Sequence, residues 1–332
     1  MKVCISIILL FSSICVSARS WQPDILKNGF EMSYVDQGID YSGKVRSTII
    51  RRLSPTGRHD KAVLYIHGFN DYFFQTEMAL KFNSNGYDFY AVDLRKYGRS
   101  IMPGQKKFQV RNFDEYVADV DSAIAEIKNA GVGEIILAGH STGGLVASYY
   151  MVTTNNASID ALILNSPFLD WNLGDMESLV PLVSFLGKFC PDFKIEQGDG
   201  TAYSESLLKD GGHGEWHYDT NWKLRKSPDV DAGWVRAVDE AQRTLRKHVG
   251  AIKIPILLMY SSKSAGYSEW APGANKSDIV LDVNDIKHYG LMLGPKVNCT
   301  KVVGGVHDLI LSSRNVREPL YDYIFKWLST VK

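Results

Sequence analysis

The chain has 332 residues, of which 45% are hydrophobic and 22% are charged. This composition is typical of a globular protein and excludes disordered, collagen-like and low-complexity chains. Lys and Arg together number 37, as do Asp and Glu, so the formal net charge is zero, and without a basic excess we expect no nucleic-acid partner.

Residues 1–18 predict a signal peptide that is removed on export. Lys2 is followed by a mostly apolar run from Val3 to Val16, and Ala18 supplies a small residue at the expected cleavage position. An uncleaved anchor is the less favoured alternative, because the run is shorter than the roughly 20 residues that a spanning helix needs. We therefore expect a mature chain that begins near Arg19 and is periplasmic, attached to the cell surface or secreted.

The cysteine content allows one disulfide in the mature chain. Cys4 and Cys15 fall in the expected leader, which leaves Cys190 and Cys299. An exported protein meets an oxidising compartment, in which such a pair can form a disulfide. Two separate thiols agree with the sequence equally well, so the pairing stays open at this point.

Apolar runs and helical spacing alternate along most of the chain after the leader. The expected strands are Val45–Leu53, Ala62–Ile66, Tyr87–Val92, Glu134–Ala138, Ala161–Leu164, Ile254–Tyr260 and Thr300–Val303. The expected helices are Gln75–Asn85, Phe113–Ala130, Leu145–Val152 and Val316–Leu328. This alternation predicts an α/β fold, with a mostly parallel sheet that is covered by helices on both faces.

Two stretches break the alternation. Residues 167–250 combine closely spaced apolar side chains, up to Phe189, with a polar stretch that contains Gly, His and Trp. We interpret them as a cap inserted over the sheet of a single domain that spans residues 19–332. The second stretch, Ser261–Ser277, is rich in small residues and has no periodicity, as functional or mobile connections often do.

The sharpest chemical signal is the sequence GHSTG at residues 139–143, a G-x-S-x-G pattern. It stands between an expected buried strand and a helix that is rich in small residues. Small residues allow the strand to turn sharply into the helix, so that the serine hydroxyl stands at the edge of the sheet near the positive end of the helix. The pattern therefore predicts that Ser141 is a nucleophile.

A serine hydroxyl is a weak nucleophile, so it needs a base and an acid that holds the base. His307 is the best base, because it follows the last expected strand on a glycine-rich loop. The chain order Ser, acid, His places the acid after the strand Ile254–Tyr260. Asp278 is preferred over Asp282 because it directly precedes an apolar run, whereas Asp282 suits a helix cap. The alternative of Asp282 stays open.

A tetrahedral intermediate also needs donors for its negatively charged oxygen. Two backbone N–H groups usually serve. One is expected at Thr142, which opens the helix after the nucleophile. The other is expected at Phe69, in the turn that follows an early strand. His67 and His140 flank these turns and are interpreted as structural.

Taken together, these residues resemble the α/β-hydrolase superfamily, and within it the lysophospholipase, monoacylglycerol lipase and serine aminopeptidase-like group. The resemblance rests on HGF at 67–69, DLRKYGRS at 93–100, GHSTG at 139–143, SDIV at 277–280 and GVHD at 305–308. It implies an α/β-hydrolase fold with a cap over an acyl pocket. It also implies these roles: nucleophile Ser141, acid Asp278, base His307, and oxyanion-hole N–H groups of Phe69 and Thr142. The stretch Ser261–Ser277 is longer than the usual turn of this group.

The resulting hypothesis is an exported serine hydrolase, a lysophospholipase- or monoacylglycerol-lipase-like esterase that needs no cofactor and no metal. The expected partner is a small-molecule or lipid ester. The apolar segment Leu179–Phe189 of the cap fits a lid that touches membrane surfaces transiently, and a helix packed on the core gives the same pattern. The oligomeric state stays open. No H-E-x-x-H, paired-cysteine, dinucleotide or P-loop pattern is present, and His213 and His217 lack a third ligand nearby.

Two alternatives remain. The first is a peptidase or amidase on the same fold, in which a cap acid such as Glu215, Asp219 or Asp231 recognises a substrate amine. The second is a non-catalytic binding module on a hydrolase fold, which the presence of serine, acid and histidine together disfavours. The same stretch of the cap, GGHGEWH at residues 211–217, either lines the substrate entrance or packs as ordinary surface.

Overall fold

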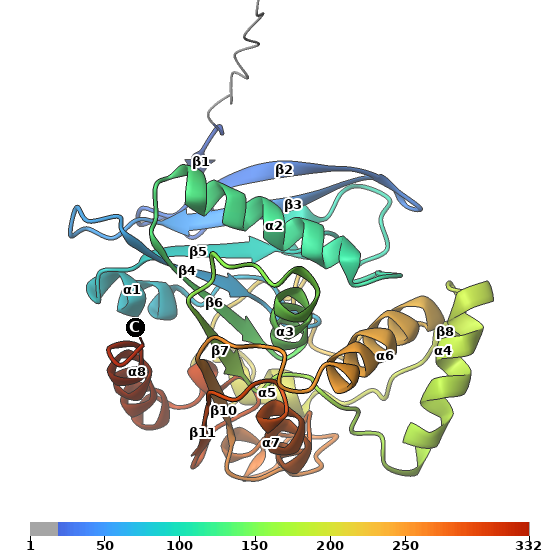
Figure 1. Cartoon of the computed structure of the whole chain (residues 1–332). Coiled ribbons are helices and arrows are strands. Elements are labelled where there is room, and N and C mark those ends of the chain that lie inside the picture. Colours follow the sequence, from blue (N-terminus) through green and yellow to red (C-terminus); the bar gives the residue numbers. More distant parts are fainter. Residues whose placement is uncertain (1–18, 332) are drawn as a thin grey trace, which may run out of the picture.

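The computed structural model describes residues 19–331, so the expected signal peptide lies outside the described residues. Nine strands form one sheet in the order β1-β2-β3-β5-β4-β6-β7-β10-β11 (Figure 1). From β5 to β11 all neighbouring strands are parallel, and β1, β2 and β3 add an antiparallel edge. The strands are β1 Gln22–Pro23, β2 Glu31–Asp40, β3 Gly43–Arg52, β4 Lys61–Ile66, β5 Asp88–Asp93, β6 Glu134–His140, β7 Ala161–Asn165, β10 Ile256–Ser261 and β11 Val297–Val302.

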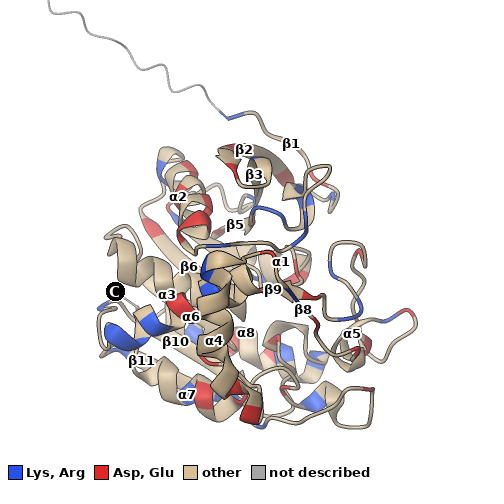
Figure 2. Ribbon diagram, turned by 90° about the vertical axis from the view of Figure 1, so that its right-hand side faces the viewer, with Lys and Arg blue, Asp and Glu red and all other residues tan. Residues whose placement is uncertain are grey.

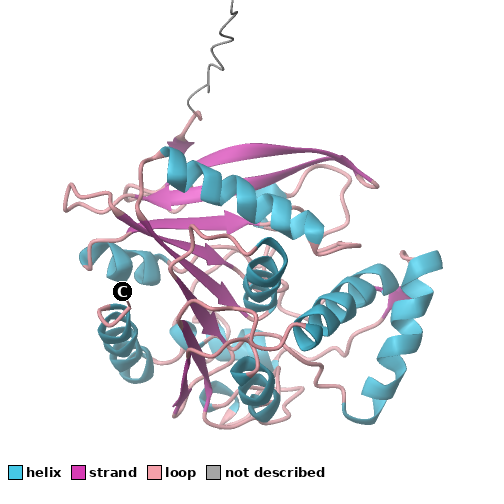
Figure 3. Ribbon diagram, in the orientation of Figure 1, coloured by secondary structure: helices cyan, strands magenta, loops and turns pink. Residues whose placement is uncertain are grey.

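Helices cover both faces of this sheet (Figure 3). Helices α1 (Thr76–Ser84) and α8 (Arg314–Leu328) pack on one face, and α2 (Asp114–Asn129), α3 (Thr142–Thr154) and α7 (Val283–Leu291) on the other. Every residue of β5 and β10 is buried, which explains why central strands are continuous apolar runs. The prediction of an α/β fold with a mostly parallel sheet is confirmed.

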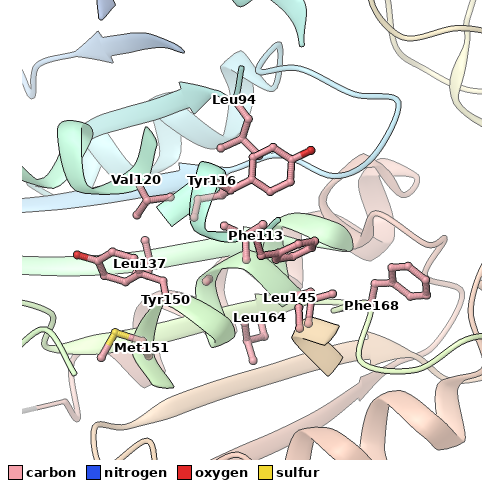
Figure 4. Close-up of a cluster of buried hydrophobic side chains, with 14 of the residues drawn as sticks. Leu94, Phe113, Tyr116, Val120, Leu137, Leu145, Tyr150, Met151, Leu164 and Phe168 are labelled. Carbon is pink, nitrogen blue, oxygen red and sulfur yellow. The ribbon is translucent and has the colours of Figure 1, made fainter. Parts of the chain in front are cut away.

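The larger core cluster lies between the sheet and helices α2 and α3. Figure 4 shows Val120 of α2 and Tyr150 of α3 beside Leu137 and Leu164, which belong to neighbouring parallel strands. All four side chains are fully buried. This packing fixes α3, and with it the residue that precedes α3, on the sheet.

The structure also contains elements that the sequence patterns did not predict. Strand β2 was missed, because it lies near the edge of the sheet and mixes exposed with buried positions. Between β7 and β10 the chain forms helices α4 (Val180–Phe189), α5 (Ala202–Leu207) and α6 (Ala232–Lys247), together with the short ribbon of β8 (Lys194–Ile195) and β9 (Val230–Asp231). We refer to residues 167–250 as the cap.

Helices α4 and α6 of the cap lie side by side at one end of the molecule (Figure 1). They approach closely at Gly187, where a β-carbon would lie 2.1 Å from the carbonyl oxygen of Ala232. The opposite side of α4 exposes Leu182, Phe185 and Phe189. Figure 2 shows the α4 ribbon mostly in the colour of uncharged residues. The cap thus carries an apolar outer face.

Two further expectations concern cysteines and membranes. Cys190 is exposed at the end of α4 and Cys299 is half-buried on β11, and both thiols are free. A disulfide between them is therefore absent, and the alternative of two separate thiols holds. Within residues 19–331, no helix has both the length and the apolar character needed to cross a membrane.

Candidate active site

Ser141 occupies a tight turn between β6 and α3. Its backbone has a φ of 52° and a ψ of −119°, a conformation that a non-glycine residue adopts only where its surroundings impose it. The flanking glycines permit the turn: a β-carbon at Gly139 would lie 2.4 Å from the oxygen of Gly143, and one at Gly143 would lie 2.3 Å from the oxygen of Ile66. The turn presents the Ser141 hydroxyl at the amino end of α3.

The structure brings Ser141, His307 and Asp278 together. Nε2 of His307 lies 2.9 Å from Oγ of Ser141, and Nδ1 of His307 lies 2.8 Å from Oδ2 of Asp278. The other carboxylate oxygen of Asp278 accepts the backbone N–H groups of Val280 and Leu281. All three side chains of the triad are buried. The carboxylate is therefore fixed, and it holds the imidazole with Nδ1 as donor and Nε2 facing the hydroxyl.

The long stretch Ser261–Ser277 delivers Asp278 to this place by folding back on its own first residues, just after β10. The N–H of Asp278 donates to the oxygen of Lys263, and the oxygen of Asp278 accepts the N–H of Ala265. Asp282, the open alternative, instead caps helix α7, where its side chain accepts the N–H of Asn284. Of the two candidates, only Asp278 contacts His307.

The Phe69 and Thr142 N–H groups lie in the places expected of oxyanion donors. Thr142 is the first residue of α3, and the turn that contains Phe69 is so close that a β-carbon at Gly68 would lie 3.1 Å from Cβ of Ser141. Within residues 19–331, neither of the two N–H groups donates a hydrogen bond. Both donors are therefore free to bind a substrate oxygen.

His67 orients the Phe69 donor. The N–H of Leu94 donates to Nε2 of His67 at 3.1 Å, so Nε2 carries no proton and Nδ1 donates to the oxygen of Gly68 at 2.8 Å. That oxygen belongs to the same peptide unit as the Phe69 N–H, and the two point in opposite directions in a trans peptide. The interpretation of His67 as a structural residue agrees with this geometry.

His140 and Asn165 support the turn from behind. The backbone oxygen of Asn165 accepts the N–H of Ser141 and Nδ1–H of His140. The side-chain amide of Asn165 donates to Oδ1 of Asp308 at 2.6 Å. Burial, aided by the neighbouring His307, lowers the pKa of His140 well below its ordinary value, so this imidazole stays neutral. Sequence reasoning missed Asn165, since an asparagine at a strand end has no distinctive signal.

One buried cluster beside the triad contains metal-ligand atoms. Carboxylate oxygens of Asp71 and Asp308 and a ring nitrogen of His140 lie within 4.8 Å of one another. The ammonium of Lys223, a cap residue, lies 3.1 Å from Oδ1 of Asp71. Burial raises the pKa of Asp308, and the charge of Lys223 opposes that rise. The ammonium of Lys223 thus already compensates the charge of these carboxylates.

The cap acids proposed for amine recognition are engaged elsewhere. Glu215 pairs with Arg317, Asp219 accepts the N–H of Asn221, and Asp231 caps helix α6 and pairs with Lys106. In the neighbouring stretch 211–217, Trp216 has a structural contact, because its indole N–H donates to the backbone oxygen of Leu311.

Comparison with known proteins places this geometry in a family. The family model Hydrolase_4, described as serine aminopeptidase, S33, matches residues 57–265, more than half of the chain. The chain belongs to this family. The Hydrolase_4 match extends from just before β4, through the Ser141 turn and the cap, to the end of β10, so it includes the turn of Phe69 but not Asp278 or His307.

One curated relative and two solved structures of other proteins are also similar to this chain. Phospholipase YtpA of Bacillus subtilis is 28% identical over 202 residues, which are 59% of this chain and 73% of the relative. The fold is similar to monoglyceride lipase from Saccharomyces cerevisiae (TM-score 0.66, 16% identity, 96% of this chain and 97% of the other) and to monoacylglycerol lipase from Paleococcus ferrophilus (TM-score 0.63, 19% identity, 86% and 98%). The chain is thus an α/β-hydrolase, and its fold is similar to that of these lipases.

Proposed function

We propose that this protein is a serine hydrolase that cleaves carboxylic esters through an acyl-enzyme on Ser141. The observation that carries the proposal is the unbroken chain of contacts from Ser141 through His307 to Asp278, at 2.9 and 2.8 Å. This arrangement activates a serine hydroxyl without a metal or cofactor.

The mechanism follows from the contacts. Nε2 of His307 takes the hydroxyl proton as Oγ of Ser141 attacks the ester carbonyl, and Asp278 stabilises the imidazolium that forms. The N–H groups of Phe69 and Thr142 bind the negatively charged oxygen. His307 then gives its proton to the leaving alcohol, and the same residue activates a water molecule that releases the acid.

We propose a monoacyl lipid ester, such as a monoacylglycerol or a lysophospholipid, as the substrate class. Three aromatic side chains support an apolar acyl site: the ring of Phe69 lies 4.8 Å from that of Trp234 in the cap and 5.4 Å from that of Phe108. The names of YtpA and of the two lipases point to the same class.

The apolar outer face of α4 supports transient contact with a lipid surface. Leu182, Phe185 and Phe189 are each about two-thirds exposed, at 66%, 64% and 64%. Exposed apolar side chains that form one patch often mark a surface that binds a membrane or another protein. We also propose that the chain is exported, as residues 1–18 predict. Cell fractionation tests the export, and flotation with phosphatidylcholine vesicles tests the contact.

The amidase alternative draws on the family description, but no contact in the cap favours it. Glu215 and Asp231 already pair with Arg317 and Lys106, whereas Asp219 accepts the backbone N–H of Asn221, so two of the three carboxylates have a cationic partner within the chain. The ester proposal is therefore the stronger of the two.

Initial rates on a matched series of p-nitrophenyl esters, monoacylglycerols and an aminoacyl amide test the proposal, with Ser141→Ala as the inactive control. We expect long-chain monoacyl esters to be cleaved fastest and the amide not to be cleaved. Cleavage of the amide alone would support the peptidase alternative. Hydrolysis by Ser141→Ala at the wild-type rate would overturn the site assignment.

A further inference from the structure

The turn that carries the Phe69 N–H is held by the core on one side and by the cap on the other. On the core side, His67 fixes the Gly68 carbonyl, as described above. On the other side, three consecutive residues, Phe69, Asn70 and Asp71, each direct a side chain to the cap. Cap contacts therefore begin at the oxyanion donor itself.

Asn70 makes the most specific of these contacts. Its amide donates to the oxygen of Leu224 at 2.9 Å and accepts the N–H of Leu224 at 2.7 Å. Its backbone has a φ of 50°, which lies in the left-handed region that asparagine tolerates better than most residues. Two reciprocal hydrogen bonds thus tie the turn to the cap backbone in one register.

Asp71 and Lys223 form a buried ion pair next to that tie. Asp71 is fully buried, Lys223 is 4% exposed, and Nζ of Lys223 lies 3.1 Å from Oδ1 of Asp71. The carboxylate accepts no hydrogen bond among the described residues, so Lys223 supplies its compensation. The ammonium also lies 5.5 Å from the ring centroid of Tyr203 in the cap, and the N–H of Asp219 donates to Tyr72 of the core at 2.8 Å.

Such a buried ion pair fixes the positions of its two side chains more than it raises the stability of the fold. A buried ion pair adds little net stability compared with an apolar pair, but removing one partner leaves an uncompensated charge that the structure must move to hydrate. Asp71 can keep its place, two residues after the donor, only while Lys223 is beside it. The cap segment at residues 219–224 therefore restrains the turn.

We propose that the cap completes the oxyanion hole, with Asn70 and Lys223 as positioning residues that hold the Phe69 N–H against Ser141. This inference rests on the proposed function, because these N–H groups bind an oxyanion only if Ser141 attacks a carbonyl group. It gives the cap a part in the chemical step, in addition to any part in binding the acyl chain.

The test is a comparison of kcat and KM on p-nitrophenyl butyrate for the wild type, Asn70→Gly, Lys223→Met and Lys223→Met with Asp71→Asn. Glycine tolerates the backbone of residue 70 and removes both hydrogen bonds to Leu224. Arg111→Met is the matched control, since it breaks another contact between core and cap, the 2.9 Å pair with Asp192.

Asn70→Gly is expected to lower kcat about 10- to 100-fold, part of the cost of losing a whole oxyanion donor, and to leave KM within about threefold. Lys223→Met is expected to lower kcat similarly, and adding Asp71→Asn is expected to restore about tenfold, because the uncompensated charge is gone. Arg111→Met is expected to stay within about twofold of the wild type, as exposed ion pairs contribute little.

An unchanged kcat in Asn70→Gly, or a loss that lies wholly in KM, would overturn the inference. Circular dichroism reports whether each variant folds. If Lys223→Met does not fold, Asn70→Gly decides alone, because it keeps the buried ion pair. Failure of the proposed function looks different: the wild type itself would neither cleave the ester nor react with a fluorophosphonate at Ser141.

Discussion

The carboxyl edge of the sheet and the cap differ in how far their side chains are buried. At the sheet edge, Ser141, Asp278 and His307 are 8%, 0% and 2% exposed, and each sits next to a buried strand or in a loop tied to one. On the cap, α4 exposes its apolar side chains and is packed mainly against α6. The sheet edge and helix α6 of the cap belong to the same buried core, whereas α4 packs on α6 and leaves its outer side exposed.

This difference indicates a division of labour. Ser141, His307 and Asp278, the proposed nucleophile, base and acid, are placed mainly by loops and turns at the ends of sheet strands. The oxyanion turn lies between the two regions, with His67 on the core side and Asn70 on the cap side. Variants in the two regions should therefore affect different measurements.

The largest expected effect lies at the sheet edge. Asp278→Asn is expected to lower kcat for ester hydrolysis by about 10⁴-fold, because the imidazole loses the partner that fixes its tautomer. Asp282→Asn is the matched control and is expected to stay near the wild-type rate, since asparagine caps a helix as well as aspartate does. Equal losses in both variants, measured by steady-state kinetics, would contradict the assignment of the acid.

A pair of leucines compares packing in the two regions. Leu164 on β7 is fully buried and Leu182 on α4 is 66% exposed. Leu164→Ala is expected to lower the free energy of unfolding by about 3 kcal/mol, while Leu182→Ala changes it by less than about 0.5 kcal/mol. Urea unfolding measures both. A large loss in Leu182→Ala would show that α4 is packed more tightly than its exposure indicates.

The smallest expected effect concerns the buried imidazole of His140. Because burial lowers its pKa below the ordinary 6.5, the unfolded chain takes up a proton below pH 6.5 that the folded chain does not. This group therefore makes the protein less stable as the pH falls, by about 1 kcal/mol between pH 7.5 and 5.5. His140→Gln is expected to lack that part of the pH dependence, as followed by urea unfolding at both pH values. The same pH dependence in both proteins would contradict it.

The sequence predicted the sheet edge better than the cap, and the reason is local. Buried parallel strands are continuous apolar runs, and the Ser141 turn needs glycines at 139 and 143, so both leave marks within a few residues. The choice between Asp278 and Asp282 depended on a loop that folds back on its own first residues after β10, which spacing alone does not reveal.

The contacts between the core and the cap leave no local pattern in the sequence. Lys223 and Asp71 are far apart in the sequence, and each reads by itself as an ordinary charged surface residue. The apolar pattern of α4 fits an exposed lid and a helix packed on the core equally well, because its apolar residues lie on an exposed as well as a buried side. Such pairings are set by the tertiary fold, so only the three-dimensional structure shows them.

The most direct test of the mechanism is to look for the acyl-enzyme itself. The protein is mixed with excess p-nitrophenyl ester, the initial burst of p-nitrophenol is recorded, and the quenched protein is digested for mass spectrometry. The mechanism predicts a burst of one equivalent and an acyl group on the peptide that contains Ser141. Steady hydrolysis without a burst and without an acyl group on Ser141 would contradict it.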